Sequence, residues 1–465
     1  MVEEKEFSKE FECRGKWWLP DNPELKISGV LKFSPTNGGT LKLDGMLDPE
    51  SEVYLTRMRD FPIILGLTTD NEEITLKDCF EISYELYGNT SISSIDFTSL
   101  FKKIHFEKEE DIKFKSIDTN YSYLDEWIGI SGLSFKYGEE DKDGFSITYK
   151  PPDHFMISIN DFKLSLIFKT EYSMELNKFY THAKAYLRIE FNDGKERSFK
   201  EFLDIFNKIK NFLSLCVWVK PVYYMGITGK TELNKRVFGD KITLQPAVEI
   251  LFQERYFQKE IDIGSFSFLV RFEQIRERFA IILSNWFNKA ELLEPFYNLY
   301  FGLLYNLHLY LGLQFLSLTQ AIEFYHRKIY SGNYVCDEEY NAIYNDLLQA
   351  IPQKTNDGLK ERLKTYLEFG NEFTLRKRLE DILRELDWLM AILFERKEEF
   401  INEVVELRNY FTHYSSELSV DDRELLHIVE ILNRIVAAIM LKEIGFDSEE
   451  LERLFNDNRL FRKIL

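Results

Sequence analysis

The sequence lacks the patterns that most readily identify a catalytic centre. It contains no Gly-x-Ser-x-Gly, no His-Glu-x-x-His and no dinucleotide-binding glycine fingerprint. Its four cysteines form no Cys-x-x-Cys pair and no Cys–His spacing suited to zinc: Cys13, Cys79, Cys216 and Cys336. The seven histidines are dispersed along the chain. We therefore expect no metal site and no cofactor, and this use of cysteine is typical of a reducing cytoplasm.

Positive charge is also scarce. The chain of 465 residues has 59 Lys and Arg against 78 Asp and Glu, which gives a formal net charge of −19. This balance excludes a general nucleic-acid coat protein, because such proteins bind by neutralising many phosphates. It leaves open a nuclease whose positive charge is confined to one site, or one that builds its groove by oligomerising.

Apolar segments that could enter a membrane are few. The N-terminus, "MVEEKEFSKE", has no apolar stretch of the kind found in signal peptides. Residues 296–321 carry no charge and are numerous enough to span a bilayer. Polar side chains that are costly in lipid interrupt this run: Asn298, Asn306, His308, Gln314 and Gln320. We therefore predict a buried helix there and a cytoplasmic protein.

The first part of the chain has the pattern of β-strands. "ELKISGVLKFS" and "GTLKLDGML" alternate apolar and polar residues and are joined by "PTNGG", a typical hairpin connection. The same alternation returns in "HFMISINDFKLSLIFKT" and "AKAYLRIEF". Residues 1–190 are therefore predicted to form a β-rich antiparallel domain, either a sandwich or a distorted barrel.

The period of the apolar residues changes after residue 190. In "SFKEFLDIFNKIKNFLSLCV" they recur every three or four positions, as in an amphipathic helix, and a strand-like segment follows. We assign residues 191–268 to a mixed α/β connecting region. Residues 269–465 are helical in pattern almost to the end, so the predicted fold class is α+β, with an all-α bundle after the β-rich domain.

One short stretch of the last part, "VVELRNYFTHYSSEL", places Arg408 five residues before His413. Composition alone makes about one Arg-x(4–6)-His match expected by chance, so the spacing does not by itself identify a site. The two residues lie near the end of a predicted amphipathic helix, where side chains can leave the bundle. Five residues turn the direction around a helix axis by about 140°, so two copies of the chain would be needed to surround one cleft.

These residue types can cleave RNA without metal. A neutral imidazole can take the proton of a ribose 2′-hydroxyl, which then attacks the adjacent phosphate. A guanidinium can bind the non-bridging oxygens as charge develops on them. Asn409 could orient the phosphate or the imidazole, and Tyr414 could stack on a base. The same residues also allow a simpler interpretation, in which a solvated arginine and a histidine end a helix.

Three segments resemble a known family. "LRNYFTHY" resembles the Arg-x(4–6)-His signature of HEPN ribonucleases, in the form with a polar residue after the arginine. "LSLTQAIEFYHRKIY" (residues 316–330) and "LEFGNEFTLRKRLEDIL" (residues 367–383) are similar to the first and middle helical segments of the ApeA-like HEPN domain. "GKWWLPDNPELKISGVLKFSPTNGGTLKLDGML" (residues 15–47) is similar to the start of the N-terminal domain that accompanies it.

The resemblance implies a bacterial anti-phage protein that acts by abortive infection. A β-rich N-terminal domain would sense infection or regulate a HEPN endoribonuclease domain, here residues 269–465, and HEPN domains usually pair. The resemblance makes Arg408 and His413 the catalytic residues and Asn409 an accessory one. Glu323 and His326 match polar positions of the first helix, where they either support the site, cap a helix or form an internal ion pair with Arg327 or Lys328.

The expected partners are RNA, a second copy of the chain and a phage-derived trigger. The RNA would be tRNA or another structured cellular RNA, and the assembly a homodimer or a higher homo-oligomer. Residues 301–465 contain 20 Lys and Arg against 29 Asp and Glu, so RNA binding requires a local basic surface. Arg376, Lys377 and Arg378 are the candidates, although a solvated helix face with (i, i+4) ion pairs is the simpler explanation of this segment.

Two other functions remain open at this point. One is a non-catalytic sensor or scaffold whose HEPN bundle only dimerises or binds RNA. The other is a HEPN domain that accepts a nucleotide from a nucleotidyl transferase, with Tyr410 or Tyr414 as the acceptor.

Overall fold

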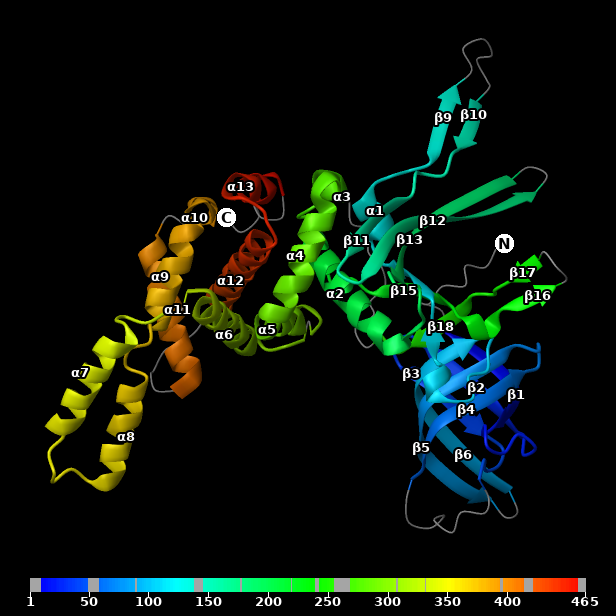
Figure 1. Ribbon diagram of the computed structural model, residues 1–465, viewed down its shortest axis with the longest axis horizontal. Helices are drawn as coiled ribbons and strands as arrows, with labels where there is room; N and C mark the ends of the chain where they lie inside the picture. The colour runs from blue at the N-terminus through cyan, green and yellow to red at the C-terminus, as the bar shows by residue number, and fades with distance from the viewer. Residues whose placement is uncertain are drawn as a thin grey trace. The chain divides into compact units, whose positions relative to one another are not determined.

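The N-terminal part of this computed structural model is built on one antiparallel sheet whose first six strands close into a barrel (Figure 1). These strands are β1 (Phe11–Trp18), β2 (Ile27–Ser34), β3 (Gly38–Leu43), β4 (Asp60–Thr68), β5 (Glu73–Tyr87) and β6 (Thr90–Lys102). The ring runs β1-β2-β3-β6-β5-β4 and returns to β1. Alternate residues of β2 and β3 point inward, and Trp17, Leu31 and Leu41 are fully buried in the barrel core.

The barrel continues into an open sheet through β6. The first half of β6 pairs with β3 and its second half pairs with β18 (Val248–Phe252). The sheet then continues through β15 (Tyr224–Lys230), β8 (Ser116–Tyr121), β13 (Lys178–Phe191), β12 (Phe162–Glu175) and β11 (Phe155–Ile159). The predicted antiparallel β-rich domain is therefore confirmed. A sandwich or a distorted barrel was predicted, and the structure contains a barrel.

Helix α2 (Phe199–Val217) covers one face of the open sheet. It begins at a capping box in which Ser198 and Glu201 satisfy each other's backbone N–H groups. Its buried side packs on the strands: Phe202 lies 5.2 Å from Phe191 between ring centroids, and the Tyr121 hydroxyl donates to the Phe206 carbonyl at 3.0 Å. The amphipathic pattern of the sequence therefore orients this helix correctly.

Shorter elements complete this part of the chain. Two hairpins leave the sheet, β9 (Leu133–Tyr137) with β10 (Phe145–Tyr149) and β16 (Arg236–Phe238) with β17 (Ile242–Leu244). The pair β7 (Lys113–Phe114) and β14 (Arg197–Ser198) is very short. Helices α1 (Leu124–Ile128) and α3 (Phe272–Ile275) join around the buried Trp127, whose indole N–H donates to the Val270 carbonyl at 2.8 Å.

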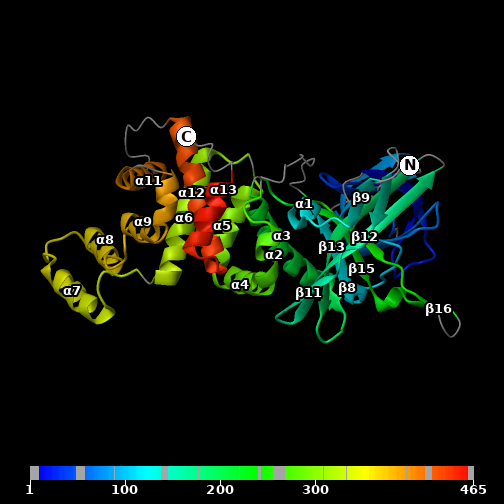
Figure 2. The same cartoon turned by 90° about the horizontal axis from the view of Figure 1, so that it is seen from above.

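The C-terminal part is helical, as predicted. Its helices are α4 (Phe279–Leu292), α5 (Glu294–Leu304), α6 (Leu311–Tyr330), α7 (Asp337–Ala350), α8 (Asp357–Glu368), α9 (Leu375–Glu385), α10 (Asp387–Leu393), α11 (Lys397–His413), α12 (Asp422–Glu443) and α13 (Ser448–Asp457). Helix α6 contacts α5, α9, α11 and α12, so it forms the centre of this bundle (Figure 2).

The structure describes residues 10–48, 58–87, 90–137, 145–175, 178–218, 220–238, 242–254, 268–306, 308–330, 332–393, 396–413 and 421–458. The chain separates into two compact units, Met1–Ser284 and Asn285–Leu465. The predicted connecting region, 191–268, does not stand apart, because its strands β15 and β18 are interior strands of the large sheet. The division falls within α4, later than the predicted boundary at residue 269.

The uncharged run 296–321 also differs from its prediction as one buried helix. It forms α5 and the first half of α6, with a turn between them that contains the exposed Tyr310. Among the helices that the structure describes, none is both long enough and apolar enough to cross a membrane.

The barrel generates a stability prediction at Gly39. A Cβ atom at this position would lie 1.9 Å from the Phe97 ring on the neighbouring strand. We expect Gly39→Ala to lower the free energy of unfolding of this unit by about 1–3 kcal/mol, because the packed ring must move. Gly226→Ala, where the nearest atom is 3.9 Å away, is the matched control. Urea unfolding would measure both, and equal stability of the two variants would contradict this packing.

Candidate active site

Arg408 lies on the last turns of α11, beside the apolar side of that helix. Ile401, Val404 and Leu407 are buried and attach the helix to the bundle. The next residue, Arg408, is only half-buried, and its side chain is 35% exposed. The periodicity of α11 therefore places a fixed cation at the border between the bundle core and solvent.

Glu323 of α6 holds this cation. The Arg408 Nη2 atom lies 3.2 Å from Glu323 Oε1, and its Nη1 atom donates to Asn409 Oδ1 at 3.3 Å. A pair this exposed contributes little to stability, but it fixes the direction of the guanidinium. Asn409 itself is exposed. The structure therefore brings together three of the residues singled out in the sequence.

The close approach of α6 and α11 at this end depends on a glycine. The Phe411 ring packs on Gly312, where a Cβ would lie 2.8 Å from the ring, and it also lies 5.7 Å from the Phe315 ring. Tyr410 is half-buried beside Phe411, with 5.2 Å between their ring centroids. The glycine thus lets α11 come near enough for Arg408 to reach Glu323.

His413 is the last residue of α11. Because the helix is regular to this point, its backbone position is turned by about 140° from Arg408 and displaced by about 7.5 Å along the axis. The side chain of His413, and the whole of Tyr414, lie outside the described residues. The grouping of Arg408 and His413 from two copies of the chain around one cleft therefore stays a prediction.

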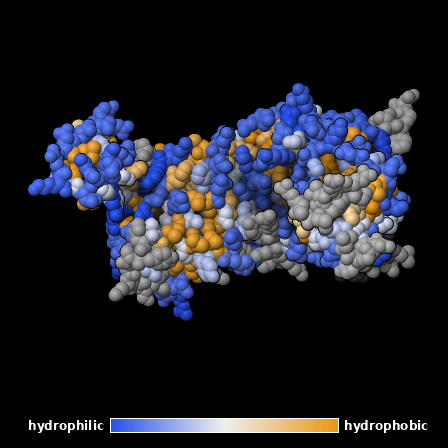
Figure 3. Space-filling view, turned by 90° about the horizontal axis from the view of Figure 1, so that it is seen from below, coloured by the Kyte–Doolittle hydropathy of each residue, from blue (hydrophilic) through white to orange (hydrophobic). Residues whose placement is uncertain are grey.

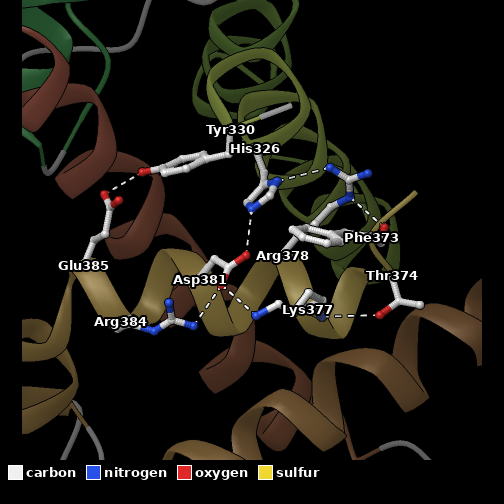
Figure 4. A network of polar contacts seen from close by, with 9 residues as sticks. All are labelled: His326, Tyr330, Phe373, Thr374, Lys377, Arg378, Asp381, Arg384 and Glu385. Carbon is white, nitrogen blue, oxygen red and sulfur yellow. Dashed lines mark hydrogen bonds and ion pairs between the residues drawn. The ribbon is translucent and has the colours of Figure 1, made fainter. Parts of the chain in front are cut away.

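His326 lies inside the bundle, away from solvent (Figure 4). Its Nδ1 atom lies 3.1 Å from Arg378 Nη1, and its Nε2 atom lies 3.4 Å from Asp381 Oδ2. The ring stacks on Tyr330, with 4.8 Å between centroids. Because arginine can only donate, Nδ1 accepts, and the neutral imidazole carries its proton on Nε2 toward Asp381.

The basic segment Arg376, Lys377 and Arg378 does not form one exposed surface. Arg378 is 1% exposed, and its Nε atom donates to the Phe373 carbonyl at 2.9 Å. Lys377 pairs with Asp381 at 3.0 Å, which is the (i, i+4) alternative weighed for this segment. Arg376 donates to Asn402 of α11. Consecutive helical residues point in directions about 100° apart, so the three side chains cannot share one face. Arg378 points into the bundle and is not part of the expected RNA-binding surface.

Burial is the largest influence on the pKa values of the side chains in this network. Desolvation lowers the pKa of His326, and the Arg378 charge lowers it further against the opposing effect of Asp381. Desolvation also lowers the pKa of Arg378. Burial alone would raise the pKa of Asp381, but Lys377, His326 and Arg384 together outweigh this and lower it. His326 is therefore held neutral between a cation and an anion.

Sequence reasoning missed Asp381 and Glu372, which complete these networks. Glu372 Oε2 lies 2.9 Å from Arg327 Nη2 and 3.6 Å from Arg378 Nη2. The predicted partner of Glu323 or His326 was Arg327 or Lys328 on the same helix, and the structure instead pairs them with α11 and α9. Of these contacts, the sequence of α9 indicates only the pair of Lys377 and Asp381, through their (i, i+4) spacing.

The comparisons with known proteins identify the family to which both parts of the chain are similar. The family model described as "Apea-like HEPN" matches residues 316–450, from within α6 to within α13. The helical unit is therefore a HEPN domain, a class that generally implies ribonuclease activity. The model described as "ApeA N-terminal domain 1" matches residues 12–286, more than half of the chain. The chain belongs to the ApeA family, whose domains indicate an anti-phage protein of HEPN type. Searches of curated proteins and of solved structures found no match.

Acid is predicted to destabilise the helical unit by protonating His326. Its folded-state pKa lies below the unfolded value of about 6.5, so the unfolded chain takes up the proton first. The neutral ring contributes fully to the free energy of unfolding above pH 6.5. This contribution is lost as the pH falls from there toward the folded-state pKa. We expect the free energy of opening of α6, measured by amide hydrogen exchange, to fall between pH 7 and pH 5.5.

The variant His326→Gln cannot take up this proton, so its pH dependence is expected to be flatter. His427→Gln, at an exposed histidine of α12, is the matched control. The same slope in the parent and in His326→Gln would contradict the assignment of His326 as a neutral buried acceptor.

Proposed function

We propose that this protein is a metal-independent HEPN endoribonuclease of an abortive-infection defence against phage. The observation that supports it best is the guanidinium of Arg408, held by Glu323 at the solvent border five residues before His413. The Arg408 side chain is 35% exposed, so the guanidinium is accessible to a phosphate while Glu323 fixes its position. Family membership supports the same function.

In the proposed reaction, His413 is the general base and Arg408 the electrophilic stabiliser. The imidazole takes the proton of a ribose 2′-hydroxyl, and the 2′-oxygen attacks the adjacent phosphorus. The bond to the 5′-oxygen of the next nucleotide breaks, and this oxygen takes up a proton from water to become a 5′-hydroxyl. The guanidinium binds the non-bridging oxygens as negative charge develops on them. Asn409 orients the phosphate. DNA is not cleaved, because it lacks the 2′-hydroxyl.

The proposed site needs two copies of the chain. Arg408 and His413 start from opposite sides of α11, so a two-fold axis at the helix end supplies the missing groups to each cleft. Apolar side chains near this end support such an interface: Tyr310 is 84% exposed and Leu313 is 48% exposed, next to the Gly312–Phe411 contact. A homodimer is the smallest assembly that meets this requirement.

The proposed substrate is tRNA or another structured cellular RNA. The helical unit is acidic overall, so the RNA must bind at local cations, which are Arg408 and, on the neighbouring α9, the half-buried Arg376 and Lys377. The N-terminal unit is proposed to restrain the nuclease until a phage-derived trigger binds.

Substitution of the catalytic pair tests this proposal. We expect Arg408→Ala and His413→Ala each to lower RNA cleavage and protection against phage by at least 100-fold. Arg396→Ala, near the other end of α11, is the matched control and keeps the activity, because Arg396 pairs locally with Glu399. Purified variants with parent-like circular dichroism would be assayed on total cellular RNA and in infected cells.

If both variants protect cells as well as the parent does, the active-site assignment fails. That result would favour the non-catalytic sensor or scaffold.

Glu323 has a separate expected effect as a positioning residue. Glu323→Gln keeps a hydrogen-bond acceptor but removes the charge, so we expect a moderate loss of kcat, about 10-fold, with unchanged thermal stability. In the Arg408→Ala background the same substitution should cause no further loss, because Glu323 acts through Arg408. An additive loss in the double variant would contradict this role.

A further inference from the structure

A polar pocket opens at the base of the β9–β10 hairpin. Its volume of about 460 Å³ is in the range of small-molecule binding sites. Residues 130–134, which lead into β9, residues 150–153, which follow β10, and Arg276 line this pocket. All of them belong to the unit Met1–Ser284, so the pocket lies within one unit.

Lys150 and Arg276 bring two positive charges to the pocket. Both residues are exposed, and neither charge has an ion-pair partner among the residues that the structure describes. Elsewhere in the same unit, Arg188 and Lys169 are both paired with Asp118, at 2.6 and 2.9 Å. Unpaired cations in a pocket indicate an anionic ligand. Hydrophobic surface, such as that on the lobe of α7 and α8 at the left of Figure 3, gives no such indication of its partner.

Aromatic contacts bring the two cations to the same pocket. Phe155, which follows Lys150 by five positions, lies 5.5 Å from Phe272 between ring centroids. Phe272 precedes Arg276 by four positions and is buried, and the buried Trp127 ring lies 5.3 Å from it. Both segments are thus anchored in one cluster before any ligand binds, which lowers the entropic cost of binding.

The remaining wall of the pocket is held by backbone contacts and offers a further donor. The Lys150 N–H donates to the Gly132 carbonyl at 2.9 Å. A Cβ atom on Gly132 would lie 2.4 Å from the Lys150 carbonyl oxygen, so the glycine permits this close approach. The Ser131 hydroxyl oxygen accepts from the Leu133 N–H at 3.2 Å, which leaves the hydroxyl hydrogen to donate to an anion.

Asp153 also lines the pocket and restricts the kind of anion that fits. Its carboxylate forms no ion pair with Lys150 or Arg276 in the part of the chain that the structure describes. A carboxylate repels a second phosphate group, but it accepts hydrogen bonds from hydroxyl groups. Leu133 and Pro151 add apolar surface. A ligand with one phosphate, several hydroxyls and one apolar face matches this combination of groups.

We propose that this pocket binds a nucleoside monophosphate. The phosphate accepts hydrogen bonds from Lys150 and Arg276, the ribose hydroxyls donate to Asp153, and the base lies on the apolar part of the wall. The site is separate from the one proposed at Arg408, and binding to it does not require that the protein cleaves RNA.

Isothermal titration calorimetry of the full chain with the four ribonucleoside 5′-monophosphates tests this proposal. We expect at least one of them to bind, and Lys150→Ala and Arg276→Ala each to raise its Kd by about 10-fold, because each removes a charge-assisted hydrogen bond. Lys136→Ala, at an exposed lysine of β9 that does not line the pocket, is the matched control and keeps the Kd of the parent. Circular dichroism would confirm that each variant is folded.

Parallel titrations with inorganic phosphate and with the unphosphorylated nucleosides separate the contributions of the ligand groups. We expect each to bind about 10-fold more weakly than the best monophosphate, since each lacks part of the contacts. Asp153→Ala should narrow the preference for the nucleotide over phosphate, because the acceptor for the ribose hydroxyls is lost. Arg408→Ala should bind the nucleotide as the parent does, which separates this site from the proposed RNA site.

Two results would overturn the proposal. One is the absence of binding to the parent at nucleotide concentrations up to about 1 mM, which corresponds to a binding free energy of about −4 kcal/mol or weaker. The other is an equal Kd for the parent, Lys150→Ala and Arg276→Ala. A Kd for inorganic phosphate equal to that for every nucleotide would reject the nucleoside part of the ligand.

Discussion

The polar side chains that α6 carries into the bundle must find partners, and this requirement organises the helical unit. Glu323 pairs with Arg408 of α11, and His326 lies between Arg378 and Asp381 of α9. Arg378 is 1% exposed, and its charge would cost several kcal/mol without these acceptors, so α6 and α9 are fixed relative to each other by specific contacts as well as by apolar packing. The proposed catalytic arginine is oriented by this arrangement.

The same network joins two surfaces of the HEPN unit that are distant in sequence. Arg378 donates to the chain segment at the base of the α7–α8 hairpin, and His326 lies one helical turn after Glu323 on α6. The hairpin and the Arg408 end of α11 therefore attach to one rigid element.

Local patterns predicted many elements, because strand alternation and helix periodicity are short-range properties. The alternation in β2 and β3, the amphipathic helix α2 and the helix that carries Arg408 were all predicted from the sequence. Barrel closure and the pairing of β15 with β8 were not, since they join residues about 50 and about 100 positions apart. For the same reason the predicted connecting region merged with the sheet.

The site was predicted in part. Arg408 and Glu323 were singled out, but their contact spans 85 positions and has no local signature. Arg378 was expected at the surface because charged residues usually are exposed, and the acceptors at Phe373 and His326 explain why it is buried. An uncharged run was predicted as one helix, because composition does not show the turn that separates α5 from α6.

The chemistry of the cleavage products tests the central claim most directly. Purified protein would be incubated with cellular RNA in excess chelator, and the ends of the fragments would be analysed. Attack by the 2′-hydroxyl predicts 2′,3′-cyclic phosphate and 5′-hydroxyl ends, formed at the same rate with and without added divalent cation. Fragments with 3′-hydroxyl and 5′-phosphate ends, or cleavage that stops in chelator, would contradict the account.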